Sequence, residues 1–396
     1  MIELLSPAGD IEKLKIALHY GADAVYFGGQ NYGLRANAKN FSNEEIKEAV
    51  KMAHELGKKV YVTVNIIFHD EDFVCLEDYL TYLDKISVDA IMVSDVAVLE
   101  ICNQLNLKLE RYISTQASVL NHEAALFYQE LGSKRVVLAR EAMREDVITI
   151  KNKTNQTLEA FIHGAMCTAF SGKCILSNYV TNRDSNRGGC AQLCRWHYGF
   201  FNEGKKIPHD FQMSSKDLNM IPYFKEMIDA GIYSFKIEGR MRSIYYIATV
   251  LHTYREFFEK ISNNTITEEY TNYYLNILNR CANRESSPQF FNKAPDEDDQ
   301  YYLNTREEQS NKDFLGIIID NKDGIITMEQ RNNFKVGDEV QFFGPNTETF
   351  NYVIDHIYDE NEEKIEVAPH AQMIVKIRAK LPLKPKDMMR IKVFDF

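Results

Sequence analysis

The chain has 396 residues, of which 45% are hydrophobic and 26% are charged, and its formal net charge at pH 7 is −11. These values are ordinary for a soluble globular protein, and the acidic balance argues against a surface coated with phosphate-binding groups. The sequence contains no apolar run of about 18 residues and opens without a secretory signal, so we expect a cytoplasmic protein with no membrane partner.

The first 260 residues alternate short apolar or β-branched runs with segments of helical period. Ser42 and Glu45 have the spacing of a capping box that begins a helix over 42–57, and Gly57 ends it. Strands are expected at residues 2–9, 23–29, 59–68, 89–95, 109–118, 135–140, 158–166 and 234–240. This alternation favours an α/β fold, a (β/α)8 TIM-like barrel over residues 1–261, and an open doubly wound sheet is the alternative.

Polar and charged residues gather where the expected strands end. In (β/α)8 barrels the active site lies at the carboxyl ends of the strands. The residues at those ends are Pro7–Gly9, Gly28–Gly29, Asn65, Ser94–Asp95, Ser114–Gln116, Arg140–Glu141, His163–Cys167 and Glu238–Arg240. The positions before them are mostly Val, Ile, Leu and Tyr, so the pattern predicts a rim that faces a ligand.

Beyond the eighth strand the pattern changes twice. Residues 243–261 are expected to form the helix that closes the barrel, and 262–313 a helical extension with an acidic linker at 294–313. Short runs separated by turn signals then predict a small all-β barrel domain over 314–396. Its last part, 371–396, has an excess of Lys and Arg, which is either a solvated face or a nucleic-acid contact.

Four of the seven cysteines follow the pattern C-x6-C-x15-C-x3-C, at Cys167, Cys174, Cys190 and Cys194. In a reducing compartment such a group is more often metal-binding or catalytic than disulfide-bonded. Structural zinc sites favour closely paired cysteines at both ends, and only the second pair is close here. The spacing leaves an iron–sulfur cluster, zinc and simple burial open. The remaining cysteines are expected to be ordinary small apolar residues: Cys75, Cys102 and Cys281.

Three arginines lie in or beside the loop that separates the cysteine pairs. Arg183, Arg187 and Arg195 suit the recognition of phosphate or carboxylate through paired hydrogen bonds. The alternative is that they are surface arginines that pair with neighbouring carboxylates such as Asp184. Trp196 either stacks on a base or packs against the hydrophobic side of the cysteine group.

The eighth strand ends in KIEGRMRS, which places Glu238, Arg240 and Arg242 at the expected barrel mouth. Glu238 with an arginine makes an acid–base and anion-binding pair, and a structural salt bridge is the alternative. His163 precedes the first clustered cysteine by four residues, and it is either a catalytic proton-transfer group or a packed histidine bonded to backbone.

Several segments together resemble the collagenase-like family known as peptidase U32, most closely its prephenate-dependent tRNA uridine hydroxylase branch. They are LLSPAG, GADAVYFGG, STQAS, VVLARE, FIHGAMCTAFSGKCILSNYVTNRDSNRGGCAQLCRW and SFKIEGRMRSIYYIATV. The resemblance runs over residues 2–290 and continues into the C-terminal domain. The compact CAQLC favours the tRNA branch over the quinone-pathway members, whose third and fourth cysteines are separated differently.

This resemblance implies an enzyme that hydroxylates the wobble uridine of tRNA to 5-hydroxyuridine without oxygen. It implies that the four clustered cysteines hold a 4Fe–4S cluster and that prephenate donates the hydroxyl group. The expected partners are the tRNA anticodon loop and a small anionic hydroxyl donor, with a protein partner subunit as a further candidate. The residues expected to hold RNA phosphate or donor are Arg183, Arg187, Arg195, Arg240 and Arg242.

Two other functions fit parts of the pattern. A peptidase of the zincin type needs H-E-x-x-H, but His54–Glu55 and His122–Glu123 are followed by Lys58 and Leu126 where the second histidine belongs. No G-x-S-x-G nucleophile motif occurs either. The other alternative is an RNA-binding module without chemistry, in which the cysteines hold zinc instead of a cluster.

Overall fold

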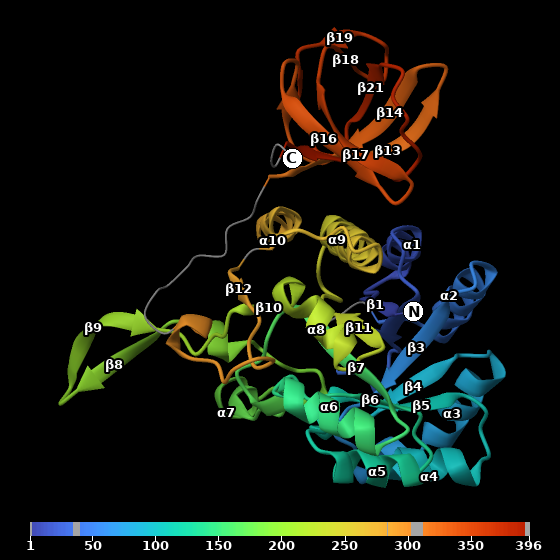
Figure 1. Cartoon of the computed structure of the whole chain (residues 1–396), viewed down its shortest axis with the longest axis vertical. Helices are drawn as coiled ribbons and strands as arrows, with labels where there is room; N and C mark the ends of the chain where they lie inside the picture. The colour runs from blue at the N-terminus through green and yellow to red at the C-terminus, as the bar shows by residue number, and fades with distance from the viewer. Residues whose placement is uncertain (1, 35–39, 283, 302–311, 393–396) are drawn as a thin grey trace. The chain divides into compact units, whose positions relative to one another are not determined.

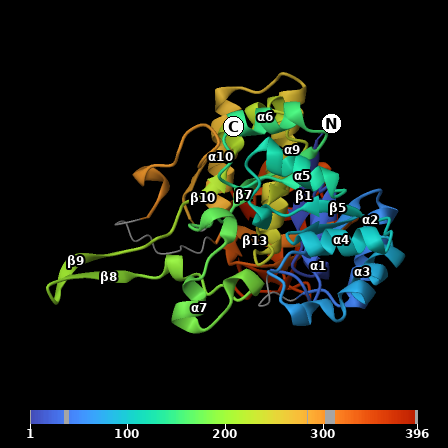
Figure 2. The same cartoon turned by 90° about the horizontal axis from the view of Figure 1, so that it is seen from below.

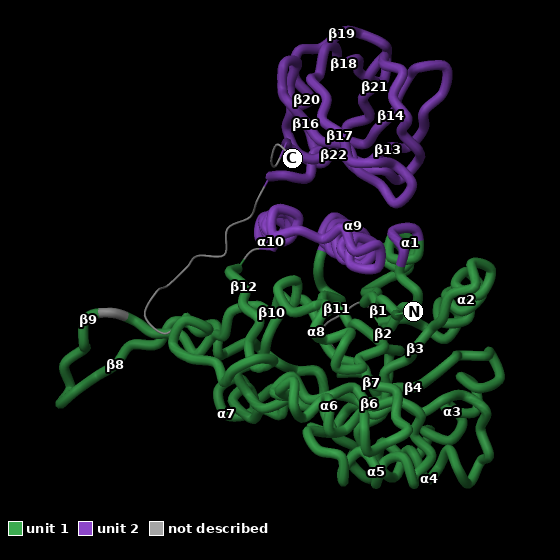
Figure 3. The backbone as a smooth tube through the Cα atoms, in the orientation of Figure 1, with its two compact units in different colours: residues 1–18, 22–242, 284–307 green, residues 19–21, 243–283, 308–396 purple. Residues whose placement is uncertain are grey.

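The computed structural model of the chain describes residues 2–34, 40–282, 284–301 and 312–392. Its contacts divide into two compact units, coloured separately in Figure 3. The first holds residues 1–18, 22–242 and 284–307, and the second holds residues 19–21, 243–283 and 308–396. Residues 302–311 of the expected linker and 393–396 of the expected last strand lie outside the described residues.

Eight parallel strands of the first unit close into a barrel. They are β1 (Glu3–Pro7), β2 (Ala24–Gly28), β3 (Lys59–Val64), β4 (Ala90–Val93), β5 (Glu110–Ile113), β6 (Arg135–Val137), β7 (Thr157–Gly164) and β11 (Ser234–Ile237). Each strand from β1 to β6 pairs with the strand that follows it, and β11 pairs with both β7 and β1. The TIM-like barrel is therefore confirmed, and the alternative of an open sheet is wrong.

Helices lie around the outside of these strands (Figures 1 and 2). They are α1 (Ile11–His19), α2 (Asn43–Glu55), α3 (Leu76–Lys85), α4 (Val96–Gln104), α5 (His122–Glu130), α6 (Arg144–Lys153) and α8 (Phe224–Asp229). In α2 the buried residues are Ile46, Ala49, Val50 and Ala53. This spacing puts the apolar residues on one stripe of the helix, which explains why the segment folds as an amphipathic helix.

Ser42 begins α2 as the sequence predicts. Its hydroxyl accepts a hydrogen bond from the Glu45 backbone N–H at 3.2 Å, and the Glu45 carboxylate accepts one from the Ser42 N–H at 2.8 Å. Replacing Ser42 by alanine is expected to lower the free energy of unfolding by about 1 kcal/mol, measured by urea denaturation. Glu48→Ala, on the exposed face of α2, is the control, with an expected change below about 0.5 kcal/mol. Equal losses in both variants would contradict a capping role.

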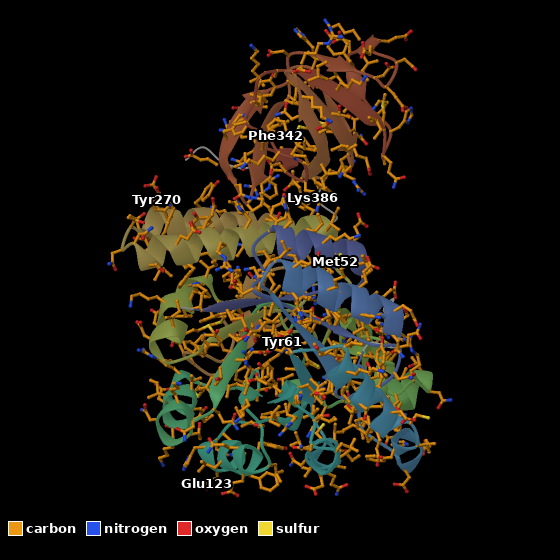
Figure 4. The ribbon with its side chains drawn as sticks, turned by 90° about the vertical axis from the view of Figure 1, so that its right-hand side faces the viewer. Met52, Tyr61, Glu123, Tyr270, Phe342 and Lys386 are labelled. Carbon is orange, nitrogen blue, oxygen red and sulfur yellow. The ribbon has the colours of Figure 1, made fainter. Side chains whose placement is uncertain are left out.

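Paired charges cross the interior of the barrel. Glu3, Arg135, Glu159 and Lys236 are each no more than 4% exposed. Arg135 donates to Glu3 and to Glu159 Oε2 (3.0 Å), and the Lys236 ammonium lies 3.0 Å from Glu159 Oε1. Tyr61, labelled in Figure 4, donates to Glu3 at 2.7 Å. These contacts join side chains from strands on different sides of the barrel, and each buried charge has a partner.

The sequence pattern does not predict four shorter strands of the first unit. Strand β10 (Asp217–Asn219) pairs antiparallel with the end of β7 and parallel with β12 (Ser286–Ser287). Strands β8 (Tyr198–Asn202) and β9 (Lys205–Phe211) form a hairpin that projects from the barrel (Figures 1 and 2). The hairpin and β10 lie in the chain between the last clustered cysteine and the eighth barrel strand, and β10 extends the sheet at the site end of β7.

The second unit contains the helix expected over 243–261, α9 (Ile244–Ser262), together with α10 (Glu268–Cys281) and an eight-stranded sheet. In spatial order the strands are β17 (Thr347–Val353), β16 (Glu339–Gly344), β22 (Met388–Ile391), β13 (Phe314–Lys322), β14 (Ile325–Gln330), β21 (Ile374–Arg378), β18 (Ile357–Tyr358) and β19 (Lys364–Ile365). Strands β15 (Phe334–Lys335) and β20 (Val367–Ala368) form a separate pair. Phe342, labelled in Figure 4, is fully buried in the core of this sheet. The small antiparallel domain is thus confirmed.

Three basic residues of the stretch 371–396 have polar partners within the second unit. Arg390 is 1% exposed, and its Nε donates to the side-chain oxygen Oε1 of Gln341 at 2.8 Å. Lys376 and Lys392 pair with glutamates at 3.1 and 2.6 Å. These contacts favour a structural role over a nucleic-acid contact for the three residues.

Among the helices of the described segments, none combines the length and apolar composition that a membrane crossing needs.

Candidate functional site

The carboxyl ends of the barrel strands surround a cavity of about 160 Å³. The clustered cysteines all line it: Cys167, Cys174, Cys190 and Cys194. Its charged lining residues are Arg140, Lys236, Arg240 and Glu238. The cavity therefore brings thiols from the loop after β7 together with charged groups from the ends of β6 and β11.

Side chains within the cysteine loop hold its two halves together. The loop contains the short helix α7 (Leu176–Thr181) between the second and third cysteines. The Asn186 carboxamide accepts from the Cys174 N–H at 3.2 Å and donates to the Cys174 carbonyl at 3.1 Å. The hydroxyl of Ser177 accepts from the Ala191 N–H at 3.1 Å. The Asn and Ser residues of this loop thus fix the backbone that carries the thiols.

Two further contacts fasten the cysteine loop to the segments that follow β6 and β3. Glu141, after β6, accepts hydrogen bonds from the backbone N–H and the hydroxyl of Ser171 at 2.7 and 2.6 Å. Arg187 donates to the Asp72 carboxylate, with 2.7 Å between Nη2 and Oδ1. Hydrogen bonds from Arg187 lower the pKa of Asp72 to about 2, so the pair stays ionised near neutral pH.

Backbone N–H groups point at two of the sulfur atoms. The Leu176 nitrogen lies 3.5 Å from Cys174 Sγ, and the Gln192 nitrogen lies 3.4 Å from Cys190 Sγ. Hydrogen bonds to sulfur are among the contacts that tune the sulfurs of iron–sulfur clusters. The backbone of the loop therefore supplies a donor to each of these two sulfur atoms.

The thiols share one electrostatic environment. Burial raises the pKa of Cys167, against the opposing effects of the Ala169 N–H and the Arg140 charge. Burial likewise raises the pKa of Cys194 to about 11, while Arg195 opposes the shift. Charge on the neighbouring cysteines raises both pKa values further. Within the described residues no group of three or more His, Cys, Asp or Glu side chains is arranged to hold a metal ion.

Two of the three cations of the cavity, Arg140 and Lys236, lie against aromatic rings. The Arg140 guanidinium lies 4.2 Å from the centre of the Phe161 ring, and Arg140 donates to the Ala165 carbonyl at 3.1 Å. Lys236 lies 4.2 Å from the centre of the Tyr26 ring. Burial lowers the pKa of Lys236, and its Glu159 partner opposes that shift. Cations held in this way present positive charge in a partly desolvated space.

Gly28, at the end of β2, makes room for the Arg240 guanidinium. A Cβ atom at Gly28 would lie 2.9 Å from Arg240 Nη1 and 3.2 Å from the Thr63 hydroxyl. Arg240 itself is 7% exposed. The absence of a side chain at Gly28 is therefore a requirement for the position of this arginine.

The structure brings some of the expected side chains to the cavity and not others. Glu238 and Arg240 line it, whereas His163 and Arg242 do not belong to its lining. His163 is 3% exposed on β7. Burial, with a contribution from the Arg242 charge, lowers the pKa of His163 to about 3, so its ring is neutral near pH 7. Arg242 lies 3.3 Å from the Asp217 carboxylate.

The arginines of the cysteine loop lie outside the lining of the cavity. Arg183 is exposed, Arg187 forms the ion pair with Asp72, and Arg195 donates to the Gln192 side chain at 2.7 Å. Their expected role in holding RNA phosphate or donor stays a prediction. For Arg187 the contacts agree with the alternative, a pairing with a carboxylate. The partner is Asp72, which lies in the segment between β3 and α3.

Sequence reasoning missed a buried ion pair beside the site. Arg284 Nη2 lies 2.6 Å from Asp217 Oδ1, and both side chains are less than 10% exposed. Asp217 stands on the unexpected strand β10, and Arg284 follows α10 far along the chain. No local pattern connects two such residues, so only the fold reveals the pair.

The cysteines outside the cluster differ from one another. Cys102 and Cys281 are buried, as expected of small apolar residues. Cys75 is exposed just before α3, so the same expectation is wrong for it. Its segment, DEDFVCLED, is mostly polar, and this was the signal against burial.

Two sequence profiles match most of the chain. Residues 9–301 match that of Peptidase family U32, and residues 310–390 match that of the Peptidase family U32 C-terminal domain. Together they cover most of the barrel, from the residues after β1, and nearly all of the antiparallel sheet described above.

Three proteins that are similar in sequence to this chain have names that point to different activities. The tRNA hydroxylation protein P1 of Bacillus subtilis (strain 168) is 44% identical over 98% of this chain and 94% of its own length. The 23S rRNA 5-hydroxycytidine C2501 synthase of Escherichia coli (strain K12) is 39% identical over 66% of this chain and 40% of its own length. A collagenase of Porphyromonas gingivalis (strain ATCC BAA-308 / W83) is 32% identical over 98% of this chain and 97% of its own length.

Proposed function

This chain belongs to peptidase family U32, and we propose that it is an RNA hydroxylase that converts the wobble uridine of tRNA to 5-hydroxyuridine. The observation that carries the proposal is the convergence of four cysteines on one cavity that also holds three cations and a carboxylate. The relatives named for tRNA hydroxylation and for rRNA hydroxycytidine synthesis support RNA as the substrate and hydroxylation as the reaction.

In this proposal Cys167, Cys174, Cys190 and Cys194 hold a 4Fe–4S cluster. The donor set fits such a group, because four thiols face one cavity and backbone N–H groups point at two of them. When bound, the cluster supplies electron-transfer or Lewis-acid chemistry.

The cationic side of the cavity is assigned to the hydroxyl donor. Prephenate, the donor that the family resemblance implies, carries two carboxylates. Arg140 and Arg240 offer guanidinium N–H groups that bind carboxylates through charge-assisted hydrogen bonds. These arginines would fix the donor by its anionic groups and leave the rest of the cavity to the base.

The target base has to leave its stack to reach this cavity. A space of about 160 Å³ suits small groups such as a base ring and does not suit a stacked helix. Glu238 is the carboxylate of the described cavity lining, so in this proposal it is the side chain that exchanges a proton with the bound base or donor. His163, buried and neutral, would then serve packing instead of proton transfer.

Replacing Gly28 by alanine is expected to raise the KM for the donor about tenfold. The added methyl group would displace the Arg240 guanidinium, and a hydrogen bond to a charged group contributes about 1.5–3 kcal/mol. Steady-state kinetics with prephenate measure the effect, and the KM for RNA serves as the internal control. An unchanged donor KM in a folded, iron-loaded variant would contradict the assignment of Arg240.

The test of the proposed function combines metal content with nucleoside analysis. Protein purified without oxygen is expected to be brown and to hold about four iron atoms per chain. Transfer RNA from a strain that lacks the gene is expected to lose 5-hydroxyuridine and to regain it with the intact gene. Zinc in place of iron, or tRNA with unchanged 5-hydroxyuridine, would overturn the proposal.

The same samples test the alternatives suggested by two relatives. Loss of 5-hydroxycytidine from rRNA in place of the tRNA change would assign the enzyme to ribosomal RNA, in line with the E. coli relative. The collagenase name of another relative favours proteolysis as a second candidate. Gelatin and collagen incubated with the iron-loaded protein are expected to stay intact, and their cleavage would favour the peptidase.

A further inference from the structure

Exposed aromatic side chains gather along the cysteine loop. In the described part of the chain seven large aromatic side chains are exposed, and five of them lie between residues 170 and 201. These five, here called the aromatic rim, are Phe170 (51% exposed), Tyr179 (82%), Trp196 (46%), Phe200 (47%) and Phe201 (67%). Single exposed apolar residues are ordinary, but a concentration of them beside a cavity marks an interaction surface.

The rim belongs to the segment that also carries the thiols. Phe170 lies between the first and second clustered cysteines, and Tyr179 lies on α7 between the second and third. Trp196 follows Cys194 by two residues, and the hairpin of β8 and β9 begins just after it. The rim and the thiols therefore belong to one continuous stretch of the chain, and Phe170 and Tyr179 lie in the loop whose residues line the cavity.

Positive charge is concentrated in the same segment. Residues 170–210 contain six Lys and Arg residues against three Asp and Glu residues, in a chain whose net charge is −11. Of the basic residues, Lys173, Arg183, Lys205 and Lys206 are exposed. A local basic excess in an acidic protein is the electrostatic pattern that attracts phosphate.

The hairpin places aromatic and cationic groups side by side. Its strands pair with each other, and Phe201 stands opposite Lys206 in that pairing. The Phe200 ring stacks on Phe211, with 4.0 Å between ring centres and 15° between planes. This internal stacking fixes part of the hairpin, while Phe201 keeps its face open to solvent.

We infer that the aromatic rim and its lysines bind the unpaired nucleotides that flank the target base, an inference that rests on the proposed RNA substrate. Aromatic faces stack on bases of any sequence, and the nearby cations attract the phosphates between them. Double-stranded RNA keeps its base faces stacked, so the rim selects an unpaired loop. The charge pattern favours RNA over a second copy of this acidic chain as the occupant.

The test uses iron-loaded protein and an anticodon stem-loop RNA, with binding measured by fluorescence anisotropy. Tyr179→Ala and Phe201→Ala are each expected to weaken binding about tenfold, because one base stack is lost. Lys205→Gln with Lys206→Gln is expected to flatten the dependence of affinity on salt. The matched control is Phe127→Ala, which removes a 49% exposed aromatic on α5 and is expected to leave affinity unchanged. A fully paired RNA of the same length is expected to bind more weakly than the stem-loop.

The outcomes separate this inference from the proposed function. Rim variants that bind the stem-loop as tightly as the unmodified protein, while the latter forms 5-hydroxyuridine, would overturn the inference alone. Unmodified protein that binds the stem-loop through the rim but never hydroxylates it would overturn the function alone. Rim variants that change the oligomeric state in light scattering, with unchanged RNA affinity, would identify the rim as an interface between copies and would also overturn the inference.

Discussion

Replacing Cys174 by serine is expected to remove the brown chromophore and most of the iron, and to abolish 5-hydroxyuridine formation. Serine keeps the shape of the side chain but replaces the soft thiolate that iron–sulfur clusters require. Cys174 lines the cavity, and its backbone is held from both sides by Asn186, so the variant changes the ligand without removing the loop's support. Iron analysis, an absorption spectrum and nucleoside analysis of tRNA measure the effect.

The matched control is Cys75→Ser. Cys75 is exposed and does not line the cavity, so iron content and activity are expected to equal those of the unmodified chain. Loss of a ligand is expected to cost more than the ~10–100-fold that follows from changes to residues behind metal ligands. Hydroxylation that survives complete loss of iron from the Cys174→Ser protein would contradict the cluster's role.

Replacing Arg135 by methionine is expected to lower the free energy of unfolding by about 3–5 kcal/mol. The variant leaves the carboxylates of Glu3 and Glu159 buried in the barrel with Lys236 as the single cation of the group. Urea denaturation followed by circular dichroism measures the loss. The control is Lys225→Ala in the exposed pair with Asp229, expected to cost less than about 0.5 kcal/mol.

The same variant has a predicted pH signature. Burial raises the pKa of Glu3, but the Arg135 charge and hydrogen bonds from Arg135, Tyr61 and Ser234 outweigh it and hold the pKa below its ordinary value. A lowered carboxyl pKa contributes stability above the unfolded-state pKa, and that stability is lost as the pH falls through the folded-state pKa. The loss of stability in Arg135→Met is therefore expected to be largest near neutral pH and to shrink as the pH falls through the folded-state pKa of Glu3. A loss of the same size at every pH would contradict this account.

The barrel could be predicted because each of its strands is a short apolar run that ends in Gly or a polar residue. The segment 59–68 shows the limit of this rule, since the strand ends at Val64 and the following apolar residues belong to the loop. The hairpin over 198–211 was not predicted, because apolar and polar residues alternate only weakly in YGFFNEGKKIPHDF and few of its side chains are buried. A strand that stands away from the core lacks the burial pattern on which sequence prediction depends.

The candidate site was predictable where its residues share one strand end or one loop. The clustered cysteines, Glu238 and Arg240 meet at the cavity because parallel strands place their carboxyl ends at one rim. The Arg187–Asp72 pair depends on contacts between distant loops, which no spacing in the sequence encodes. The neutral state of His163 follows from its burial, and a sequence position at the end of a strand does not reveal which way a side chain faces.

Lys236 belongs both to the charge network inside the barrel and to the lining of the cavity. Replacing a buried charge network by well-packed apolar residues of similar volume is often neutral or stabilising. In this chain such a replacement would also remove the Lys236 cation from the lining of the cavity. A substitution of Lys236 that stabilises the barrel interior would therefore also change the cavity. Stabilising substitutions on the outer helices avoid this conflict.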